Sequence, residues 1–477
     1  MNQDNYTLLC DFYELTMANG YFLEGKQDEI TYFDVFFRDL PEDSGYAICC
    51  GLESIVNYIN NLHFSDEDIE FLRSKKIFDE KFLSYLKNFK FTGDIWACKE
   101  GSVIFPHEPI LTVRAKSIEA QFIETYLLLV LNHQSLIATK ASRIVYAAEG
   151  RPIMEFGSRR AQGETAAIIG ARSAYIAGCF GTACTISDQI YGVPALGTMA
   201  HSWVQMFDTE FEAFDAYCRN YPTNAVLLID TYNVLNSGLP NAIKAFKKNN
   251  ITKGGVRIDS GDIAYLSKKC RRILDENGLY DINIVISNSL DEYIISELIL
   301  QGAKVNSFGV GERLITSKNN PVFGCVYKLS AIEKEGQIIP KIKVSENIAK
   351  LTNPGFKHTY RIYDKNTDKA IADLICLNGE EIDTSKPLEI FDEHDIWKRK
   401  TITDFYVKDL LIPVFIDGKQ VYELPSVKEV RENCENQLNS FWDEVRRLKN
   451  PHTYYVDLSQ NLYDLKYKMI KDITKRW

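Results

Sequence analysis

From Pro152 onward the chain repeats one pattern, in which an apolar run is followed by residues with helical spacing. Seven runs show it: RPIMEFGS, AGCFGTA, VPALGTMAH, NAVLLIDTYN, GGVRIDSGD, INIVISNSL and VNSFGVG. Strands that alternate with helices pair in parallel, because each return needs a crossover connection. Seven strands are too many for a small open sheet, so the pattern predicts a β/α barrel, regular or irregular.

The flanking regions have a different character. Residues 1–116 mix short helical patterns with β-rich runs such as ITYFDVFFRDL, and helical spacing over 117–148 predicts one long helix or two. Beyond residue 325, KIKVSE, TYRIYD, KAIADLICLNG and LLIPVFIDGKQVYEL predict an antiparallel layer, and residues 426–477 read as helical. We therefore divide the chain into 1–116, a barrel over 117–325, and 326–477. Spacing alone leaves open whether the two end parts pack together.

Bulk composition narrows the class of protein. A net charge of -10 over 477 residues argues against a dedicated nucleic-acid binder, although a local cationic pocket remains compatible with it. The eleven cysteines include no CxxC pair, which predicts reduced thiols. The first residues lack the features of a signal peptide, and the apolar run at 126–131 is too short to span a bilayer. We expect a cytoplasmic protein without a membrane segment.

In a β/α barrel the active site lies where the strands end. The ends of the predicted strands carry Arg159, Thr182, His201, Asp230, Asp259, Asn288 and the glycines from Gly309 to Gly311. In GGVRIDSGD, the period of two places Arg257 and Asp259 on the same face of a strand. That segment also fits a surface loop with a fortuitous ion pair. The number of polar strand ends favours a site.

Three segments carry candidate chemistry. His201 could act as nucleophile, base or phosphoryl acceptor, or be a core histidine bonded to a carbonyl. In EFGSRRAQG, Phe156 could stack on a flat heterocycle and Arg159 could bind carboxylate or phosphate; a helix start with a core phenylalanine is the alternative. In FGVGERLITS, Gly309 and Gly311 precede a predicted helix and could bind phosphate, or serve a plain turn.

The chain lacks several well-known signatures. It has no GxxxxGK[ST], no GxGxxG in an early βαβ unit, no HExxH and no paired-cysteine metal motif. A Mg²⁺ ion held mainly by substrate phosphates would leave little trace in a sequence. Asp259 and Asp262 are candidates to hold such an ion, and could equally contact ribose hydroxyls.

Taken together, these motifs resemble the nicotinate phosphoribosyltransferase family. The resemblance rests on DFYELTMANGYF, FDVFFRDLPEDSGYAICCGLE, EFGSRRAQG, GTMAHSWVQMF, LLIDTYN, GVRIDSGD, SNSLDEYII, FGVGERLITS and GCVYKLS, in the same order along nearly the whole chain. It implies an irregular α/β barrel beside a discontinuous α+β domain built from both ends of the chain. It also implies a homodimer with a shared active site. The implied reaction joins nicotinate to 5-phosphoribosyl 1-diphosphate with Mg²⁺, giving nicotinate mononucleotide and diphosphate, coupled to ATP hydrolysis in the salvage route to NAD.

The resemblance also assigns roles to residues. His201 matches the histidine phosphorylated from ATP, and Tyr13 matches a tyrosine that stacks on the pyridine ring, often from the partner subunit. Phe156 would supply the opposite face, with Arg159 and Arg257 as substrate-binding arginines. Residues expected at the phosphoribosyl group are Asp259, which we also count as catalytic, and Ser260, Asn288, Gly309, Gly311 and Thr316.

One segment departs from the family pattern. GTACTIS, residues 181–187, replaces the Ser-Asn that often follows Gly-Thr, which leaves the roles of Thr182 and Cys184 open. The same segment bears on the nearest alternative, nicotinamide phosphoribosyltransferase. An enzyme that binds nicotinamide benefits from a carboxylate that accepts from the amide NH₂, whereas an enzyme that binds nicotinate must avoid one because like charges repel. The segment contains no acidic residue, and the first one after it is Asp188, which favours nicotinate.

Two more remote alternatives belong to other classes. A phosphate-binding barrel aldolase or isomerase that uses a Schiff base needs a lysine at a strand end. The predicted ends offer none, and the nearest lysine, Lys253, precedes its strand. A barrel that binds a nucleotide without turning it over would be distinguished only by assay.

Overall fold

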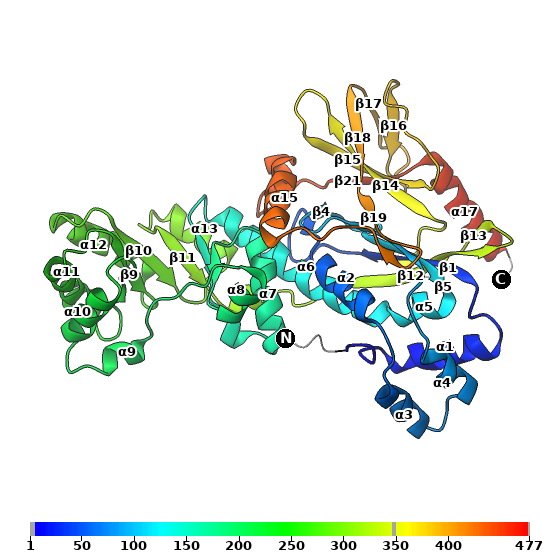
Figure 1. The fold of residues 1–477 in the computed structure, drawn as a ribbon. Coiled ribbons are helices and arrows are strands. Elements are labelled where there is room, and N and C mark those ends of the chain that lie inside the picture. Colours follow the sequence, from blue (N-terminus) through cyan, green and yellow to red (C-terminus); the bar gives the residue numbers. More distant parts are fainter. Residues whose placement is uncertain (1–4, 346–349, 476–477) are drawn as a thin grey trace. The chain divides into compact units, whose positions relative to one another are not determined.

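The computed structural model describes residues 5–345 and 350–475, which form two compact units (Figure 1). Unit 1 comprises the described parts of Met1–Leu136 and Val322–Trp477, and unit 2 is Ile137–Pro321. The sequence-based division placed residues 117–136 with the central part of the chain. In the structure they belong to unit 1, because Ile118, Phe122 and Leu127 are buried in its main core.

Unit 1 is built around an antiparallel sheet whose strands come from both ends of the chain. Its order is β13 (Gln337–Pro340), β12 (Cys325–Lys334), β1 (Ile30–Phe37), β5 (Leu111–Lys116), β3 (Asp94–Cys98), β19 (Leu411–Ile416) and β20 (Lys419–Gln420). The central strand β1 pairs with β5 on one side and with β12 on the other. Strands from both ends of the chain therefore build one sheet.

The alternation of side chains along β1 explains the position of the core. Phe33, Val35 and Phe37 all join the main hydrophobic cluster, with residues of the helices before and after the strand. Those helices are α1 (Phe12–Leu23), α2 (Leu52–Asn61), α3 (Asp66–Ser74), α4 (Glu80–Leu86), α5 (Ser117–Phe122) and α6 (Glu124–Ala147), with a short ladder of β2 (Ala47–Ile48) and β4 (Val103–Ile104). Asp34 lies on the opposite face of the strand, and its Oδ2 lies 2.7 Å from Lys357 Nζ.

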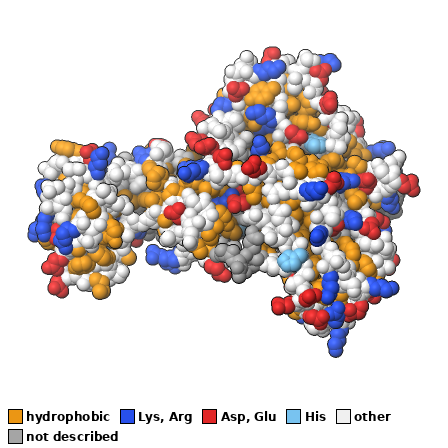
Figure 2. Space-filling view, viewed as in Figure 1, with side chains coloured by type: hydrophobic (Ala, Val, Ile, Leu, Met, Phe, Trp, Pro, Cys, Tyr) orange, Lys and Arg blue, Asp and Glu red, His pale blue; other side chains and the backbone are white. Residues whose placement is uncertain are grey.

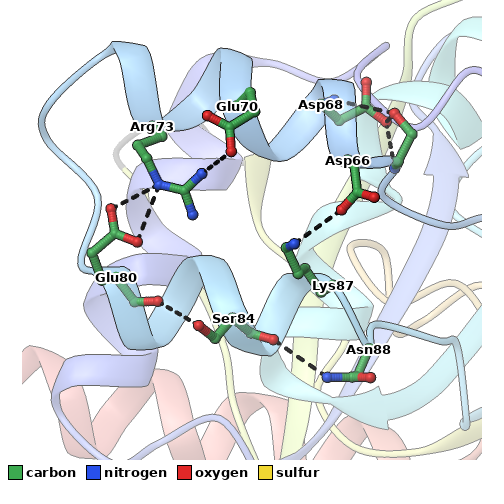
Figure 3. A network of polar contacts seen from close by, with 9 residues as sticks. Asp66, Asp68, Glu70, Arg73, Glu80, Ser84, Lys87 and Asn88 are labelled. Atoms are coloured by element: carbon green, nitrogen blue, oxygen red, sulfur yellow. Dashed lines mark hydrogen bonds and ion pairs between the residues drawn. The ribbon is translucent and has the colours of Figure 1, made fainter.

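Helices α3 and α4 are linked at the surface by ion pairs (Figure 3). Arg73 contacts both Glu70 and Glu80, and Lys87 Nζ lies 2.9 Å from Asp66 Oδ1. All of these side chains are at least a third exposed, so each pair contributes well under about 1 kcal/mol. The buried face of these helices, not the pairs, holds them in place.

The C-terminal part of unit 1 adds a second sheet. Its order is β18 (Phe405–Asp409), β14 (Lys357–Asp364), β15 (Ala370–Leu377) and β21 (Tyr455–Leu458), beside the hairpin β16 (Leu388–Phe391) and β17 (Arg399–Ile402). The helices here are α15 (Val427–Asn439), α16 (Asp443–Arg446) and α17 (Gln460–Thr474).

Two expectations for this part were wrong. β21 interrupts the segment expected to be wholly helical, and it pairs in parallel with β15. The expected strand KIKVSE has no strand over its described residues, 341–345, since β12 and β13 already form the local hairpin.

Unit 2 contains a parallel sheet with helical crossovers. Its order is β7 (Gly181–Thr182), β6 (Ile153–Glu155), β11 (Ser307–Val310), β10 (Ile282–Ser287), β9 (Gly254–Ile258) and β8 (Val226–Leu228). Every pairing in it is parallel, as the repeated pattern predicted. The α/β class is therefore confirmed.

The helices of unit 2 follow the strands in turn. They are α7 (Glu164–Ile176), α8 (Thr185–Tyr191), α9 (His201–Gln205), α10 (Glu210–Asn220), α11 (Leu239–Lys248), α12 (Ile263–Glu276), α13 (Glu292–Leu300) and α14 (Glu312–Ile315), with the 3₁₀ turn η1 (Ser158–Arg160) and the π turn η2 (Val234–Gly238). Figure 1 shows α10, α11 and α12 grouped beside β9 and β10.

A closed barrel is not among the strand pairings of the described residues. β7 and β8 are the outer strands of the sheet, and no ladder joins them within residues 5–345 and 350–475. The remaining predicted run, VPALGTMAH, forms only one bridge, between Ala195 and Thr182. The sheet as paired is open.

The surface and the thiols complete the description. Acidic and basic side chains are interspersed over the face shown in Figure 2. No disulfide joins any of the eleven cysteines, all of which lie in the described ranges. Within those ranges, no helix has the length and apolar character required to cross a membrane.

Candidate active site

The parallel strands of unit 2 end at one edge of their sheet, where α/β proteins bind ligands. A pocket of about 420 Å³ lies there. Five residues singled out from the sequence line it: Phe156, Arg159, His201, Arg257 and Asp259. They come from three separate segments, which the fold brings to one place.

Arg257 is held by three hydrogen bonds. Its Nε donates to Ser287 Oγ at 2.8 Å, Nη1 donates to Thr198 Oγ1 at 3.0 Å, and Nη2 donates to Asp259 Oδ1 at 3.0 Å. The guanidinium carbon also lies 5.8 Å from the centre of the Phe156 ring. A guanidinium has five N–H donors, so two remain for a ligand. The pocket thus presents a fixed cation beside an aromatic ring, which suits a flat anion.

The carboxylates of Asp259 and Asp230, near this arginine, accept hydrogen bonds from different donors. Asp259 accepts from Arg257 and from the Ser287 hydroxyl. Asp230 Oδ2 accepts from the Asp259 amide at 3.0 Å and from Ser260 Oγ at 2.6 Å, whereas its Oδ1 is buried without a hydrogen-bond partner. Asp230 therefore keeps one carboxylate oxygen uncommitted.

Asp262 serves a local structural role. It is the N-cap of α12, and its Oδ1 accepts from the Tyr265 amide at 2.9 Å. Such a cap satisfies one of the unpaired amides at the start of a helix. No cluster of three or more histidine, cysteine, aspartate or glutamate side chains suited to a metal ion occurs within residues 5–345 and 350–475.

His201 is the first residue of the short helix α9. Its Nδ1 lies 3.1 Å from Thr231 Oγ1, and the side chain is partly exposed in the pocket. The alternative of a buried histidine bonded to a carbonyl is therefore wrong. A ring with Nδ1 engaged by a hydroxyl leaves Nε2 as the nitrogen that can react.

Close packing around Phe156 requires glycines in β11 and in the turn after β6. A Cβ atom on Gly309 would lie 2.7 Å from Cδ2 of the Phe156 ring, and one on Gly157 would lie 2.7 Å from the Gly311 carbonyl oxygen. The helix that follows, α14, has only four residues, and Thr316 Oγ1 donates back to Glu312 O at 2.7 Å. Close packing accounts for these glycines, and their predicted contact with phosphate stays a prediction.

The other predicted residues have simpler surroundings. Arg159 is exposed on η1. Asn288 follows β10 with a φ of 115°, a conformation that non-glycine residues adopt rarely, and its side chain is exposed. Tyr13 lies on α1 of unit 1 and is 45% exposed. It is the one predicted site residue outside unit 2.

Sequence reasoning missed Glu155, at the carboxyl end of β6. Its Oε2 accepts from Thr182 Oγ1 at 2.6 Å, its Oε1 accepts from the Gly157 amide, and burial raises its pKa. Its position as the last residue of a strand run was the available signal. The absence of acids from residues 181–187 did not exclude a carboxylate beside Thr182 in space.

A second cavity, of about 210 Å³, lies in unit 1. Its two buried lysines are already paired, Lys357 with Asp34 at 2.7 Å and Lys466 with Glu393 at 2.6 Å. We therefore do not assign it to a substrate.

Three family models match successive parts of the chain. They describe the nicotinate phosphoribosyltransferase N-terminal domain over residues 8–132, the nicotinate phosphoribosyltransferase family over 152–369, and the C-terminal domain over 356–466. Nicotinate phosphoribosyltransferase of Bacillus subtilis is 39% identical over 475 residues, covering 99% of this chain and 97% of that protein. The Caenorhabditis elegans protein of the same name is 33% identical, with 96% and 92% covered.

Solved structures agree with these matches. The crystal structure of human nicotinic acid phosphoribosyltransferase has a TM-score of 0.83 and 27% identity, covering 97% of this chain and 100% of that one. Nicotinate-nucleotide pyrophosphorylase from Pyrococcus furiosus has a TM-score of 0.71 at 22% identity, with 91% and 96% covered, which is a likeness of fold.

Proposed function

Since the chain belongs to the nicotinate phosphoribosyltransferase family, we propose that the pocket of unit 2 is where nicotinate is joined to 5-phosphoribosyl 1-diphosphate. The protein is an enzyme of this type and acts in the salvage route to NAD. The observation that carries the placement is the fixed guanidinium of Arg257 beside the ring of Phe156.

Nicotinate is a flat aromatic anion, and this pair matches both of its properties. Phe156 stacks on the pyridine ring, while the two remaining N–H groups of Arg257 bind the carboxylate, assisted by Arg159 at the rim. The pyridine nitrogen attacks C1 of the ribose as diphosphate leaves. Asp259 faces the ribosyl carbon, where positive charge develops, and its bond to Arg257 fixes its orientation.

The phosphoribosyl group occupies the rest of the carboxyl edge of the sheet. Ser260 and Asn288 supply polar side chains there, with Gly309 near the end of β11 and Gly311 and Thr316 at the two ends of α14, which follows it. We also propose that residues 193–198 complete the barrel. Ala195 bridges to β7, and Leu196 lines the same pocket as Leu228 of β8.

Mg²⁺ is proposed to enter with the diphosphate. Of the three aspartates near the site, Asp259 and Asp262 accept the hydrogen bonds described above on Oδ1, and Asp230 Oδ1 is buried without a partner. A bare carboxylate oxygen is what a hard cation or its bound water requires, so Asp230 joins Asp259 and Asp262 as a candidate to hold the ion. When bound, the ion would neutralise the leaving diphosphate.

ATP is proposed as co-substrate, with His201 as the residue that accepts its γ-phosphoryl group. The partly exposed ring and the unengaged Nε2 support this role. We place the enzyme in the cytoplasm, where its substrates are made and where reduced cysteines persist.

We propose that the active enzyme is a homodimer. Leu9, Phe12, Tyr13 and Met17, on or just before α1, are between 37% and 48% exposed. A cluster of this kind on a helix is suited to being covered by a partner. A second copy of the chain would cover it and place Tyr13 against the pyridine ring of the other subunit.

The first test of this function is the choice of pyridine. We expect kcat/KM for nicotinate to exceed that for nicotinamide by roughly 100-fold, since the amide forfeits the charge-assisted bonds to Arg257, worth roughly 1.5–3 kcal/mol. The measurement is mononucleotide formation from 5-phosphoribosyl 1-diphosphate with each pyridine, with and without ATP. Equal kcat/KM values would contradict the proposed pocket.

The second test concerns the shared site. Tyr13→Ala and Arg257→Ala, each nearly inactive alone, should recover about a quarter of wild-type activity when mixed, because random exchange makes half of the dimers hybrid, each with one intact site. Subunit exchange is checked by native mass spectrometry. If hybrids form and activity does not return, the site is not shared in this way.

Of the alternatives, a nicotinamide enzyme is not favoured, because Glu155, the carboxylate that contacts Thr182, has both oxygens engaged by donors. A Schiff-base aldolase is not supported either. The described residues that line the pocket include no lysine.

A further inference from the structure

Glu155 joins three neighbouring strands behind the pocket. In the sheet, Glu155 lies opposite Thr182 of β7 on one side and Val310 of β11 on the other. Its side chain is fully buried, and its two carboxylate oxygens accept from the Gly157 amide and from Thr182 Oγ1. The Thr182 hydroxyl in turn accepts from the Cys184 amide at 2.9 Å. One carboxylate therefore fixes the turns that leave both β6 and β7.

The turn after β6 carries Phe156. Its amide donates to Val310 O at 2.7 Å, and Gly157 is held by Glu155 on one side and packs closely against Gly311 on the other. The ring is consequently fixed against Gly309. The turn after β7 carries Ala183, which lines the pocket as well. Two walls of the pocket thus depend on the same side chain.

A buried carboxylate at this place has an energetic cost that packing alone does not explain. No lysine, arginine or histidine of the described residues forms an ion pair with Glu155. An unpaired buried charge is unfavourable unless hydrogen bonds compensate, and such groups collect where function requires them. The ionised form satisfies every partner, because the Thr182 hydroxyl accepts from Cys184 and donates to Glu155.

We propose that Glu155 is a positioning residue for the pyridine, acting through Phe156 and Ala183 by fixing the two turns that carry them. This rests on the proposed function, in which Phe156 stacks on nicotinate. Glu155 itself touches no substrate, since its side chain is fully buried. Its effect therefore falls on the binding of nicotinate and leaves the binding of 5-phosphoribosyl 1-diphosphate almost unchanged.

The test is a set of steady-state measurements on the full-length protein, with kcat and the KM of each substrate determined separately. Glu155→Ala should raise the nicotinate KM about tenfold and change the other KM less than about twofold. Glu155→Gln should stay within about threefold of wild type, because its amide oxygen can accept from Gly157 while its nitrogen donates to Thr182.

Thr182→Val removes the hydroxyl without changing the shape of the side chain. It should raise the nicotinate KM in the same selective way, and the double variant with Glu155→Ala should show less than the product of the two effects, because both act through one contact. Phe156→Ala serves as the marker for the pocket itself and should raise the nicotinate KM more than either.

Each outcome decides a different statement. If Phe156→Ala leaves the nicotinate KM unchanged, the proposed pocket is wrong. If Phe156→Ala raises that KM while folded Glu155→Ala and Thr182→Val leave it unchanged, or raise both KM values equally, the positioning role is overturned. Should Glu155→Ala not fold, the selectivity of Thr182→Val decides alone, and an effect of Thr182→Val on nicotinate only supports the proposal.

Discussion

Replacement of Arg257 by alanine is expected to lower kcat/KM for nicotinate by about a thousandfold. Truncating one partner of a hydrogen-bonded charge pair costs about 2–5 kcal/mol, and Arg257 bonds to Asp259 as well as to Ser287 and Thr198. Its loss also removes the cation proposed to bind the substrate carboxylate and leaves Asp259 without its charge partner. Steady-state kinetics at saturating 5-phosphoribosyl 1-diphosphate measures the effect.

Two further variants make this result specific. Arg272→Ala removes an arginine of the same unit whose side chain is 61% exposed, so it should change kcat/KM by less than about twofold. Arg257→Lys keeps the positive charge but not the planar fork, so it should fall between wild type and alanine. A kcat/KM for Arg257→Ala within tenfold of wild type would mean that nicotinate binds elsewhere.

His201→Ala is expected to abolish the coupling to ATP, with a loss of ATPase activity of about 100-fold or more, while slow synthesis without ATP persists. The pyridine nitrogen can attack the ribose without a protein nucleophile, so the histidine is needed only for the coupled step. A phosphoryl group on His201 would add charge and acceptor oxygens beside the phosphate site, which changes the affinity for one substrate or product.

The measurement combines ATP hydrolysis, mononucleotide formation with and without ATP, and transfer of ³²P from γ-labelled ATP to the protein. His201→Asn keeps a polar side chain that cannot be phosphorylated on a ring nitrogen, and should behave like the alanine variant. His394→Ala, at a side chain 60% exposed in unit 1, is the matched control and should retain coupling. ³²P label on the His201→Ala protein would show that another residue accepts the phosphoryl group. Loss of the uncoupled reaction would give His201 a direct role in binding or chemistry.

Much of this site could be predicted from the sequence because it depends on the ends of parallel strands. Arg257 and Asp259 were placed on one face by the period of two, and the structure joins them at 3.0 Å. His201 and Phe156 follow other runs of the same pattern and line the same pocket. Local periodicity together with parallel pairing was enough to bring them together.

What the sequence did not reveal depends on contacts between segments. Glu155 ends a strand of three residues, too short for its alternation to indicate which face it takes. Gly309 looked like a phosphate loop, and only the position of the Phe156 ring explains why a larger residue cannot fit. Asp230 was counted as a strand end, but its uncommitted oxygen depends on where Ser260 and the Asp259 amide lie.

The differences between the expected and the observed fold have similar causes. The predicted run AGCFGTA gives a β7 of only two residues and the predicted run VPALGTMAH gives a single bridge, because an apolar run does not fix how much of it pairs. β21 has four residues between helical segments. Residues 117–136 look helical in either unit, and only their buried contacts assign them to unit 1.

The pairing of β1 with β12 has a consequence for how the protein folds during its synthesis on the ribosome. β1 ends at Phe37, yet the strand that covers its second edge begins only at Cys325. At synthesis rates of about 5–20 residues per second, that edge waits roughly 15–60 s for its partner. During this time Ile137–Pro321 emerges whole and can fold first, while the early half of unit 1 exposes an unpaired, strongly apolar strand. Nascent chains stalled before Cys325 should therefore be the ones that chaperones hold and that aggregate.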